Sequence, residues 1–263
     1  MLEIDHISKN YQRKGERQPF QALAPCTATI GDGEFVSIVG PSGCGKTTIL
    51  KIIQGLIKPS TGTVSLGGKT VTGPGKGRAM VFQAATLLPW FSVLKNVMFG
   101  LESYGYPKAE ARELALQQLA MVGLADFAEQ HPHELSGGMQ QRVNLARAMA
   151  VKPDVLLMDE PYAALDPQTR DEMQEQLLEI WGQTSMTVVL ITHQIDEAVY
   201  LADRVLVMSQ RPGSIMRDIE VPFERPRGIE LKYSAGFQEV VSDIWRSMRS
   251  SSGSSPRSED SHV

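Results

Sequence analysis

The sequence predicts an α/β fold built on a parallel sheet with helices on both of its faces. Short apolar runs of strand length recur along the 263 residues, and stretches with helical spacing separate them. A glycine-rich break lies between one of these strands and the helix that follows it. From about residue 88 to residue 150 helix-forming residues dominate, so we expect a mostly helical insertion there.

The chain alternates between segments of strand length and segments of helix length. Strands are expected, in order, at residues 2–7, 34–39, 62–70, 79–82, 154–158 and 186–191. The segment 62–70 is expected to be a strand pair that turns at Gly67-Gly68, and the polar residues 13–18 a hairpin or loop tip. Helices are expected at residues 47–53, 110–121 and 168–181. Parallel strands joined through helices place the sheet between two covering layers.

Composition argues against several other classes of protein. The formal net charge is −4 at pH 7, so we expect no nucleic acid partner, because binding phosphate backbones needs a basic surface. The two cysteines, Cys26 and Cys44, form no CxxC pair, which argues against a disulfide framework or a zinc knuckle. The longest apolar runs are far shorter than the ~20 residues of a membrane span, and the N-terminus lacks the build of a signal peptide. We therefore expect a cytosolic chain that reaches a membrane only through a partner.

The glycine-rich loop carries the clearest chemical signal. Residues 40–47 match the pattern GxxxxGK[ST], and they lie between a strand and a helix as this motif requires. Backbone N–H groups and the helix N-terminus can surround a polyphosphate, Lys46 can reach its β- and γ-phosphates, and the Thr47 hydroxyl can ligate Mg²⁺. The predicted nucleotide-binding residues here are Gly40, Pro41, Ser42, Gly43, Cys44, Gly45, Lys46, Thr47 and Thr48.

Two adjacent carboxylates follow the apolar strand at residues 154–158. Ligands bind at the carboxyl ends of strands in open α/β sheets, so these acids are expected near the phosphate loop. Asp159 is predicted to hold Mg²⁺ through its water shell, and Glu160 to orient and polarise the attacking water as catalytic base. A strand that happens to end in solvated acids is the alternative, and the phosphate loop in the same chain makes it the weaker one.

A third motif, Leu135–Arg142, resembles the LSGGQ signature of ABC ATPases, with Met139 where glutamine is usual. The resemblance implies a P-loop NTPase with a RecA-like parallel-sheet core, an N-terminal antiparallel β part and a helical subdomain inserted at about residues 88–150. It also implies a homodimer that stacks head to tail, with each ATP and its Mg²⁺ between the Lys46 loop of one copy and the Ser136 loop of the other. The signature residues that act on the partner's nucleotide are then Ser136, Gly137, Gly138 and Gln140.

The remaining landmarks of this family occur in the same order. The resemblance implies that Tyr11 stacks on adenine and that Gln83 senses Mg²⁺ and the γ-phosphate. Asp166 falls in the loop that crosses the dimer interface, and His193 matches the switch histidine that contacts the γ-phosphate. His193 and Glu160 are therefore the predicted catalytic residues, and the predicted Mg²⁺ ligands are Thr47, Gln83 and Asp159.

Several segments look like those of the bacterial importer group for nitrate, sulfonates and taurine. They are Thr72–Gly75, Leu87–Val93, Pro161–Asp166 and Arg225–Arg227. The resemblance implies integral-membrane permease subunits as partners and, indirectly, a periplasmic or lipid-anchored solute-binding protein, at the cytoplasmic face of the bacterial inner membrane. A permease docking patch is predicted at Leu87, Leu88, Pro89 and Trp90. The alternative for Trp90 is an ordinary core position, and an exporter or an importer of another small molecule stays open.

The resemblance covers about residues 1–225, which we expect to form one ATPase domain. Residues 226–249 are expected to form a C-terminal helical extension. The serine-rich residues 250–263 show no periodicity and are expected to be a disordered tail.

Overall fold

The computed structural model describes residues 1–12 and 19–250 of the chain. The loop tip predicted at residues 13–18 lies outside the described residues. So does the tail predicted at residues 250–263, apart from Ser250, which is the last residue of a helix.

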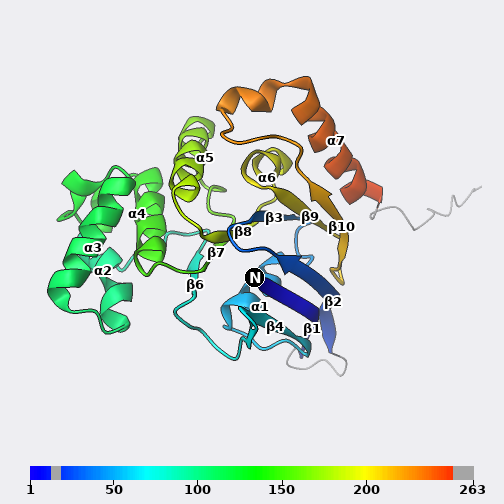
Figure 1. The fold of residues 1–263 in the computed structure, drawn as a ribbon, viewed down its shortest axis with the longest axis horizontal. Helices are drawn as coiled ribbons and strands as arrows, with labels where there is room; N and C mark the ends of the chain where they lie inside the picture. Colours follow the sequence, from blue (N-terminus) through cyan, green and yellow to red (C-terminus); the bar gives the residue numbers. More distant parts are fainter. Residues whose placement is uncertain (13–18, 251–263) are drawn as a thin grey trace, which may run out of the picture.

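Two sheets form the centre of the molecule (Figure 1). The first is antiparallel with the order β2-β1-β4-β5, and its strands are β1 (Leu2–Tyr11), β2 (Phe20–Ile30), β4 (Thr61–Leu66) and β5 (Lys69–Thr70). The second has the order β10-β9-β3-β8-β7-β6 and is parallel except for β10 at its edge. Its strands are β3 (Phe35–Val39), β6 (Arg78–Val81), β7 (Val155–Asp159), β8 (Thr187–Ile191), β9 (Arg204–Met208) and β10 (Ile215–Glu220).

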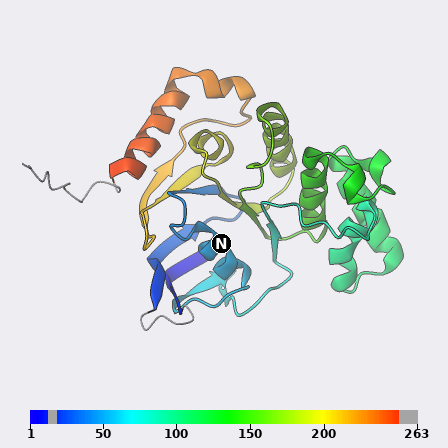
Figure 2. The same ribbon diagram turned by 180° about the vertical axis from the view of Figure 1, so that it is seen from behind.

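Helices surround the parallel sheet and also form a separate lobe. The α-helices are α1 (Lys46–Gln54), α2 (Val93–Ser103), α3 (Lys108–Met121), α4 (Gly137–Ala150), α5 (Pro167–Gly182), α6 (Ile195–Leu201) and α7 (Ala235–Ser250). Short 3-10 turns are η1 (Ala125–Phe127), η2 (Pro132–Glu134) and η3 (Ile229–Tyr233). Helices α2, α3 and α4, drawn in green, stand beside β6 and β7 in both views (Figures 1 and 2). We call residues 93–150 the helical lobe.

Alternation along the central strands divides the interior into two apolar cores. In β7, Leu156 and Met158 join the core shared with α5, α6 and the helical lobe, whereas Val155 and Leu157 join the core between the two sheets. Successive strand residues point to opposite faces, so a strand covered on both sides must be apolar at every position. Helix α1 fills the second core with Ile49 and Ile53. This arrangement holds the carboxyl ends of β3, β7 and β8 in fixed register.

The predicted fold class is confirmed, and the differences lie in elements with weak sequence signals. The helical insertion, the turn at Gly67-Gly68 and the three predicted helices are present, each within a few residues of the expected bounds. Strands β2 and β10 were not predicted, because β2 contains Pro25 and β10 is largely exposed and polar. Helix α6 has only seven residues, too few for a periodic signal. Strand β9 was also not predicted, although its apolar run resembles those of its neighbours.

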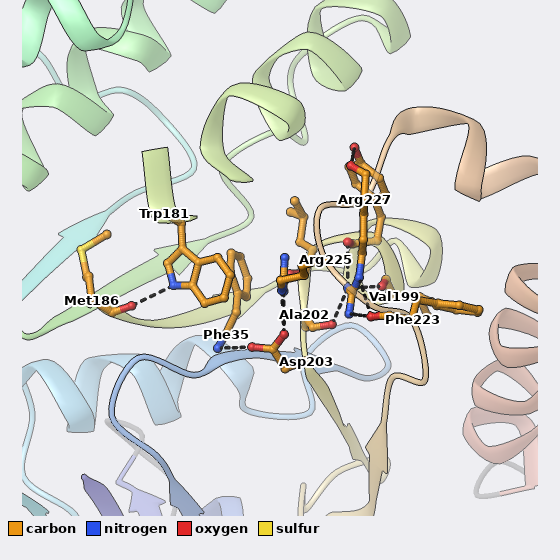
Figure 3. A network of polar contacts seen from close by, with 11 residues as sticks. Phe35, Trp181, Met186, Val199, Ala202, Asp203, Phe223, Arg225 and Arg227 are labelled. Atoms are coloured by element: carbon orange, nitrogen blue, oxygen red, sulfur yellow. Dashed lines mark hydrogen bonds and ion pairs between the residues drawn. The ribbon is translucent and has the colours of Figure 1, made fainter. Parts of the chain in front are cut away.

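The segment Arg225–Arg227 caps helix α6 (Figure 3). The Arg227 guanidinium donates hydrogen bonds to the carbonyls of Val199, Tyr200 and Ala202 at 2.7–3.2 Å. The last carbonyls of a helix have no partner inside it, so these bonds satisfy groups that would otherwise be buried and unpaired. Burial lowers the pKa of Arg227 to about 10, and the neighbouring charge of Arg225 adds to this effect.

Arg225 extends the same network to the start of β3. Its guanidinium forms an ion pair with Asp203 at 2.8 Å and lies 4.3 Å from the ring centroid of Trp181. Asp203 also accepts a hydrogen bond from the backbone N–H of Phe35 at 2.9 Å, and the Phe35 and Trp181 rings meet edge to face. The chain after β10 is thereby tied to α5, α6 and β3 at once. The domain boundary at residue 225 stays a prediction.

Candidate functional site

The loop between β3 and α1 adopts a conformation that depends on its glycines. Gly43 and Gly45 have φ angles of +74° and +107°, in the left-handed region that favours glycine. A Cβ atom on Gly45 would lie 3.0 Å from the carbonyl oxygen of Ala22, so close approach also requires glycine there. Lys46 is 6% exposed, and its Nζ donates to the carbonyls of Gly40 and Pro41 at 2.8 and 3.2 Å. The loop therefore curls around the lysine and leaves the N-terminus of α1 open.

A pocket of about 570 Å³ opens above this loop. It brings together nine residues that the sequence predicted for the site and three that it did not. The predicted ones are Tyr11, Ser42, Gly43, Gly45, Lys46, Thr47 and Thr48, joined by Glu160 and His193 from the neighbouring strands. The others are Phe20, Ala22 and Arg211. Tyr11 ends β1 and is 37% exposed at the pocket, as a side chain available for stacking must be.

A larger cavity of about 1110 Å³ lies at the amino ends of β6, β7 and β8, at the end of the sheet opposite to the phosphate loop. It is lined by residues of both charges, among them Lys69, Lys152, Asp32 and Asp154, and it contains no predicted site residue. Ligands of parallel sheets bind at the carboxyl ends of the strands, so we assign the chemistry to the smaller pocket.

The Thr47 hydroxyl and the Asp159 carboxylate meet at the carboxyl end of β7. Thr47 Oγ1 donates to Asp159 Oδ1 at 3.1 Å. Burial raises the pKa of Asp159; the hydrogen bond from Thr47 opposes this shift, and the charge of Glu160 adds to it. Hydroxyl and carboxylate oxygens are hard ligands that suit Mg²⁺. Among the described residues no group of three His, Cys, Asp or Glu could hold a metal, so an ion here would complete its shell with phosphate oxygens and water.

Glu160 and His193 lie next to each other at the ends of β7 and β8. The Nδ1 atom of His193 is 3.3 Å from Oε2 of Glu160. Glu160 has a φ of +48°, an uncommon conformation for a residue with a side chain, and its N–H donates to the Ile191 carbonyl at 2.9 Å. That hydrogen bond ties the strained residue to the next strand, which turns its carboxylate toward His193 and the pocket.

Several predicted residues do not line this pocket. Gly40, Pro41 and Cys44 belong to the loop but do not line the pocket, and burial raises the pKa of the Cys44 thiol. Gln83 is exposed, two residues beyond the end of β6, and is absent from the pocket lining. In this structure Gln83 therefore does not lie at the pocket that contains the phosphate loop.

The signature residues lie at the N-terminus of α4 in the helical lobe, also outside the pocket lining. Ser136 is exposed and caps α4 by accepting a hydrogen bond from the Met139 N–H at 3.3 Å. Gly137 is exposed as well, whereas a Cβ on Gly138 would lie 2.7 Å from Thr169 of α5. Gln140 turns back and donates to the carbonyls of Pro132 and Leu135. The exposed cap thus leaves a second helix N-terminus outside the pocket of its own chain, and helix N-termini favour anions.

Asp166 has a structural partner in this conformation. Its carboxylate accepts a hydrogen bond from the Thr169 N–H at 3.0 Å and caps α5. The same backbone contact lowers the pKa of Asp166. The side chain remains exposed, so it is available to a partner copy.

The predicted docking patch, residues 87–90, precedes the helical lobe and is partly exposed. Trp90 is 68% exposed and Pro89 is exposed, whereas Leu87 and Leu88 are half-buried. The core alternative for Trp90 is therefore wrong. Phe91 packs against Trp90 at a ring-centroid distance of 6.3 Å and against the exposed Phe99 of α2 at 6.2 Å. Phe99 was not predicted, because only the folded chain brings it to Phe91.

Arg211 is a second residue that the sequence did not indicate. It comes from the turn between β9 and β10, and its Nε donates to the Gly43 carbonyl at 2.9 Å. Its guanidinium also lies 4.7 Å from the ring centroid of Phe20. The contact joins residues 168 positions apart, so no local pattern could have shown it.

Comparison with known proteins gives a consistent result. A family model described as ABC transporter matches residues 23–163. The chain is 48% identical over 224 residues to the taurine import ATP-binding protein TauB of Chromobacterium violaceum, covering 85% of this chain and 84% of that protein. It is 47% identical over 220 residues to the nitrate import ATP-binding protein NrtD of Synechocystis, covering 84% and 82%. It is 44% identical over 229 residues to the bicarbonate transport ATP-binding protein CmpD of Synechocystis, covering 86% and 80%.

A solved structure supports the same relationship. It is a dimeric ATP-binding cassette in a post-hydrolysis state with ADP and Pi, and it matches with a TM-score of 0.75 and 33% identity. The match covers 85% of this chain and all of that chain. In the part of the chain that the structure describes, no helix is both long and apolar enough to cross a bilayer.

Proposed function

This chain belongs to the ABC transporter family, and we propose that it is the ATP-hydrolysing subunit that energises import of a small solute through a separate membrane permease. The observation that carries the proposal is the meeting of three strand ends at one pocket. They bring the Lys46 loop, the Thr47–Asp159 contact and the Glu160–His193 contact together. This set of groups suits hydrolysis of a nucleoside triphosphate.

We assign the steps to residues as follows. The phosphate loop and the N-terminus of α1 bind the phosphates, with Lys46 neutralising charge on the β- and γ-phosphates. Tyr11 stacks on the adenine. Glu160 takes the proton of the attacking water, and His193 orients Glu160 and contacts the γ-phosphate.

Mg²⁺ is the cofactor that this donor set fits. Thr47 and Asp159 would hold it, with Gln83 approaching when the helical lobe closes on the nucleotide. Bound there, Mg²⁺ supplies positive charge that offsets the charge on the β- and γ-phosphates.

A homodimer completes the site. Ser136, Gly137 and Gly138 are at an exposed helix N-terminus on the helical lobe, whereas the Lys46 loop lies outside that lobe, between β3 and α1. The dimeric cassettes among the related structures support a dimer. We infer that its two copies stack head to tail, so that each pocket takes a signature loop from the other copy. Asp166, at the exposed start of α5, is then part of the interface.

The transport partner is a membrane permease, and the solute belongs to the nitrate, sulfonate or taurine type. The names of the related import subunits support this class, and the Trp90 patch offers an apolar surface for a permease segment. A periplasmic or lipid-anchored solute-binding protein then delivers the solute, and the chain works at the cytoplasmic face of the bacterial inner membrane. The alternative is the motor of an exporter or of an importer for another solute.

Two measurements test this function. Phosphate release from Mg-ATP by the purified chain should depend on Lys46, so Lys46→Ala should abolish it.

Affinity purification of the tagged chain from membranes should recover a permease, and a solute-binding protein should raise the ATPase rate of that complex. An ATP-inactive wild-type chain would contradict the ATPase assignment, and a complex indifferent to any solute-binding protein would favour the exporter alternative.

A further inference from the structure

The connection between β6 and α2 joins the nucleotide end of the molecule to the docking patch. These residues, 82–92, form neither helix nor strand, and we call them the linking segment. Gln83 lies at its start and Trp90 near its end. Among the described residues, every side chain that hydrogen-bonds to the segment from outside it belongs to α2 or α4.

Helix α4 holds the nucleotide end of the linking segment. Gln141 and Asn144 both donate to the Phe82 carbonyl, at 3.2 and 3.3 Å, directly before Gln83. Arg147 donates to the carbonyls of Ala85 and Thr86 at 3.1 and 3.0 Å, and it also donates to the Asn144 side-chain oxygen at 2.9 Å. Positions 141, 144 and 147 recur every three residues, so they form one row along the helix surface. The signature helix thus carries a polar row that fixes the backbone on both sides of Gln83.

Helix α2 holds the docking end in the same way. The Asn96 amide accepts a hydrogen bond from the Leu88 N–H at 2.7 Å. Its nitrogen donates to the carbonyls of Leu88, Phe91 and Ser92 at 3.0–3.2 Å. A single side chain therefore fixes the backbone on both sides of Trp90.

Burial makes these contacts costly to lose. Asn96 and Asn144 are both 0% exposed, and a buried amide without partners is strongly unfavourable. Both amides bond to the backbone of the linking segment. They therefore fix the path of its backbone whatever side chains it carries. A segment fixed along its length by two helices of one lobe must move with that lobe.

Building on the proposed function, we propose that Asn144, with Gln141 and Arg147, is a positioning residue for Gln83, and that Asn96 is a positioning residue for the docking patch. The two amides divide the linking segment into a nucleotide half and a permease half. Loss of the first alters hydrolysis. Loss of the second leaves hydrolysis by the isolated chain intact and loosens the surface that the permease would contact.

Steady-state kinetics of the isolated full chain test the nucleotide half. In Asn144→Ala the kcat should fall about ten-fold while the KM for ATP stays within about two-fold, because the phosphate loop and Tyr11 bind ATP without Gln83. The matched control is Gln118→Ala, which removes an amide of the same lobe on α3 that does not touch the linking segment. If Asn144→Ala does not fold, Gln141→Leu removes one bond to Phe82 with little change in volume. An unchanged kcat, or an equal fall in the control, overturns this half.

Spin-label distances test the rigid attachment without any nucleotide. Labels at Ala84→Cys and Glu113→Cys should give a distance distribution as narrow as labels at Lys95→Cys and Glu113→Cys. All three positions are exposed, and the native cysteines are buried. Asn144→Ala should broaden the first distribution and leave the second unchanged. A first distribution that is already broad in the wild type, or that stays narrow in the variant, overturns the attachment.

The docking half has its own readout. The distance distribution between labels at Trp90→Cys and Glu113→Cys should broaden when Asn96→Ala is added. The kcat of unlabelled Asn96→Ala should stay within about two-fold of the wild type. A narrow distribution in this variant overturns the role of Asn96. An inactive wild-type chain would contradict the ATPase proposal, but the distance measurements would still decide the attachment of the linking segment.

Discussion

The two adjacent carboxylates at the end of β7 face different surroundings and take different roles. Asp159 is within hydrogen-bonding distance of Thr47 on α1, and burial raises its pKa. Glu160 turns through a left-handed backbone conformation toward His193 on the next strand. Asp159 is the last residue of β7, and the left-handed conformation of Glu160 turns the chain directly after it, so we expect one acid to serve the metal while the other serves the attacking water.

The role of Glu160 predicts the behaviour of its amide variant. Glu160→Gln keeps the shape of the side chain but cannot accept a proton from water, so ATP hydrolysis should fall by about two to four orders of magnitude. ATP should still bind and should hold the dimer closed. The measurements are phosphate release and nucleotide binding on the same preparation. Near-normal hydrolysis in this variant would show that Glu160 is not the base.

At the scale of elements, helix α6 is held in place by the chain that follows the sheet. It has seven residues, and its C-terminal carbonyls are satisfied by Arg225 and Arg227 from outside (Figure 3). Buried Glu197 lies inside the same helix. A helix this short has little stability of its own, so its position next to His193 depends on these contacts.

Removal of the Arg227 guanidinium should destabilise the chain. Arg227→Ala leaves several buried carbonyls without partners, which is expected to lower the free energy of unfolding by about 2–4 kcal/mol. Thermal or urea unfolding monitored by circular dichroism measures this change. The control is Arg246→Ala on the exposed face of α7, which should change stability by less than about 0.5 kcal/mol. Equal stability of the two variants would contradict the capping role.

Glu197 should give the chain a specific pH dependence. Burial raises its pKa from 4.5 to about 8, with a further rise from Asp196, while a hydrogen bond with Thr192 and the charges of Arg170 and Lys232 act in the opposite direction. Between these two pKa values the folded chain keeps a proton that the unfolded chain releases, so stability from this group falls as pH rises, by up to ~1.4 kcal/mol per pH unit.

Glu197→Gln removes that titration. The stability of this variant relative to the wild type should therefore rise steadily from about pH 5 to pH 8, as measured by urea unfolding at each pH. Parallel stability curves over this range would mean that Glu197 is already ionised in the folded chain.

At the scale of the whole molecule, the two anion-binding helix ends belong to different lobes. The N-terminus of α1 opens into the nucleotide pocket, and the N-terminus of α4 is exposed on the helical lobe (Figure 1). In the proposed head-to-tail dimer, one chain supplies each half of a site and two copies supply two complete sites. We therefore expect ATP hydrolysis to depend on formation of the dimer.

A negative charge at the α4 N-terminus should prevent that dimer. A Cβ on Gly137 meets nothing within 4 Å, so Gly137→Asp should fold normally while it repels the partner's ATP. In a Glu160→Gln background, Mg-ATP should produce dimers that light scattering detects, and Gly137→Asp should leave monomers that still bind ATP. Gly182→Asp, at an equally open position on α5, is the matched control. Dimers formed by the Gly137→Asp variant would contradict a shared site.

The sequence by itself determined the fold class, the phosphate loop and the strand-end acids. Each of these signals occupies a few contiguous residues: glycines at 40–45 before a helix, and Asp159-Glu160 directly after a buried strand. Local conformation and local chemistry coincide there, so the order of residues along the chain is sufficient to read them.

Only the tertiary structure decided which distant residues support that chemistry. Arg211 reaches Gly43, Asn144 holds the linking segment, and Arg227 caps α6, each across 27 or more residues of sequence. These side chains bind backbone carbonyls or N–H groups, which every residue carries, so their partners leave no trace in the sequence. Such contacts exist only once packing has excluded water and made an unpaired polar group costly.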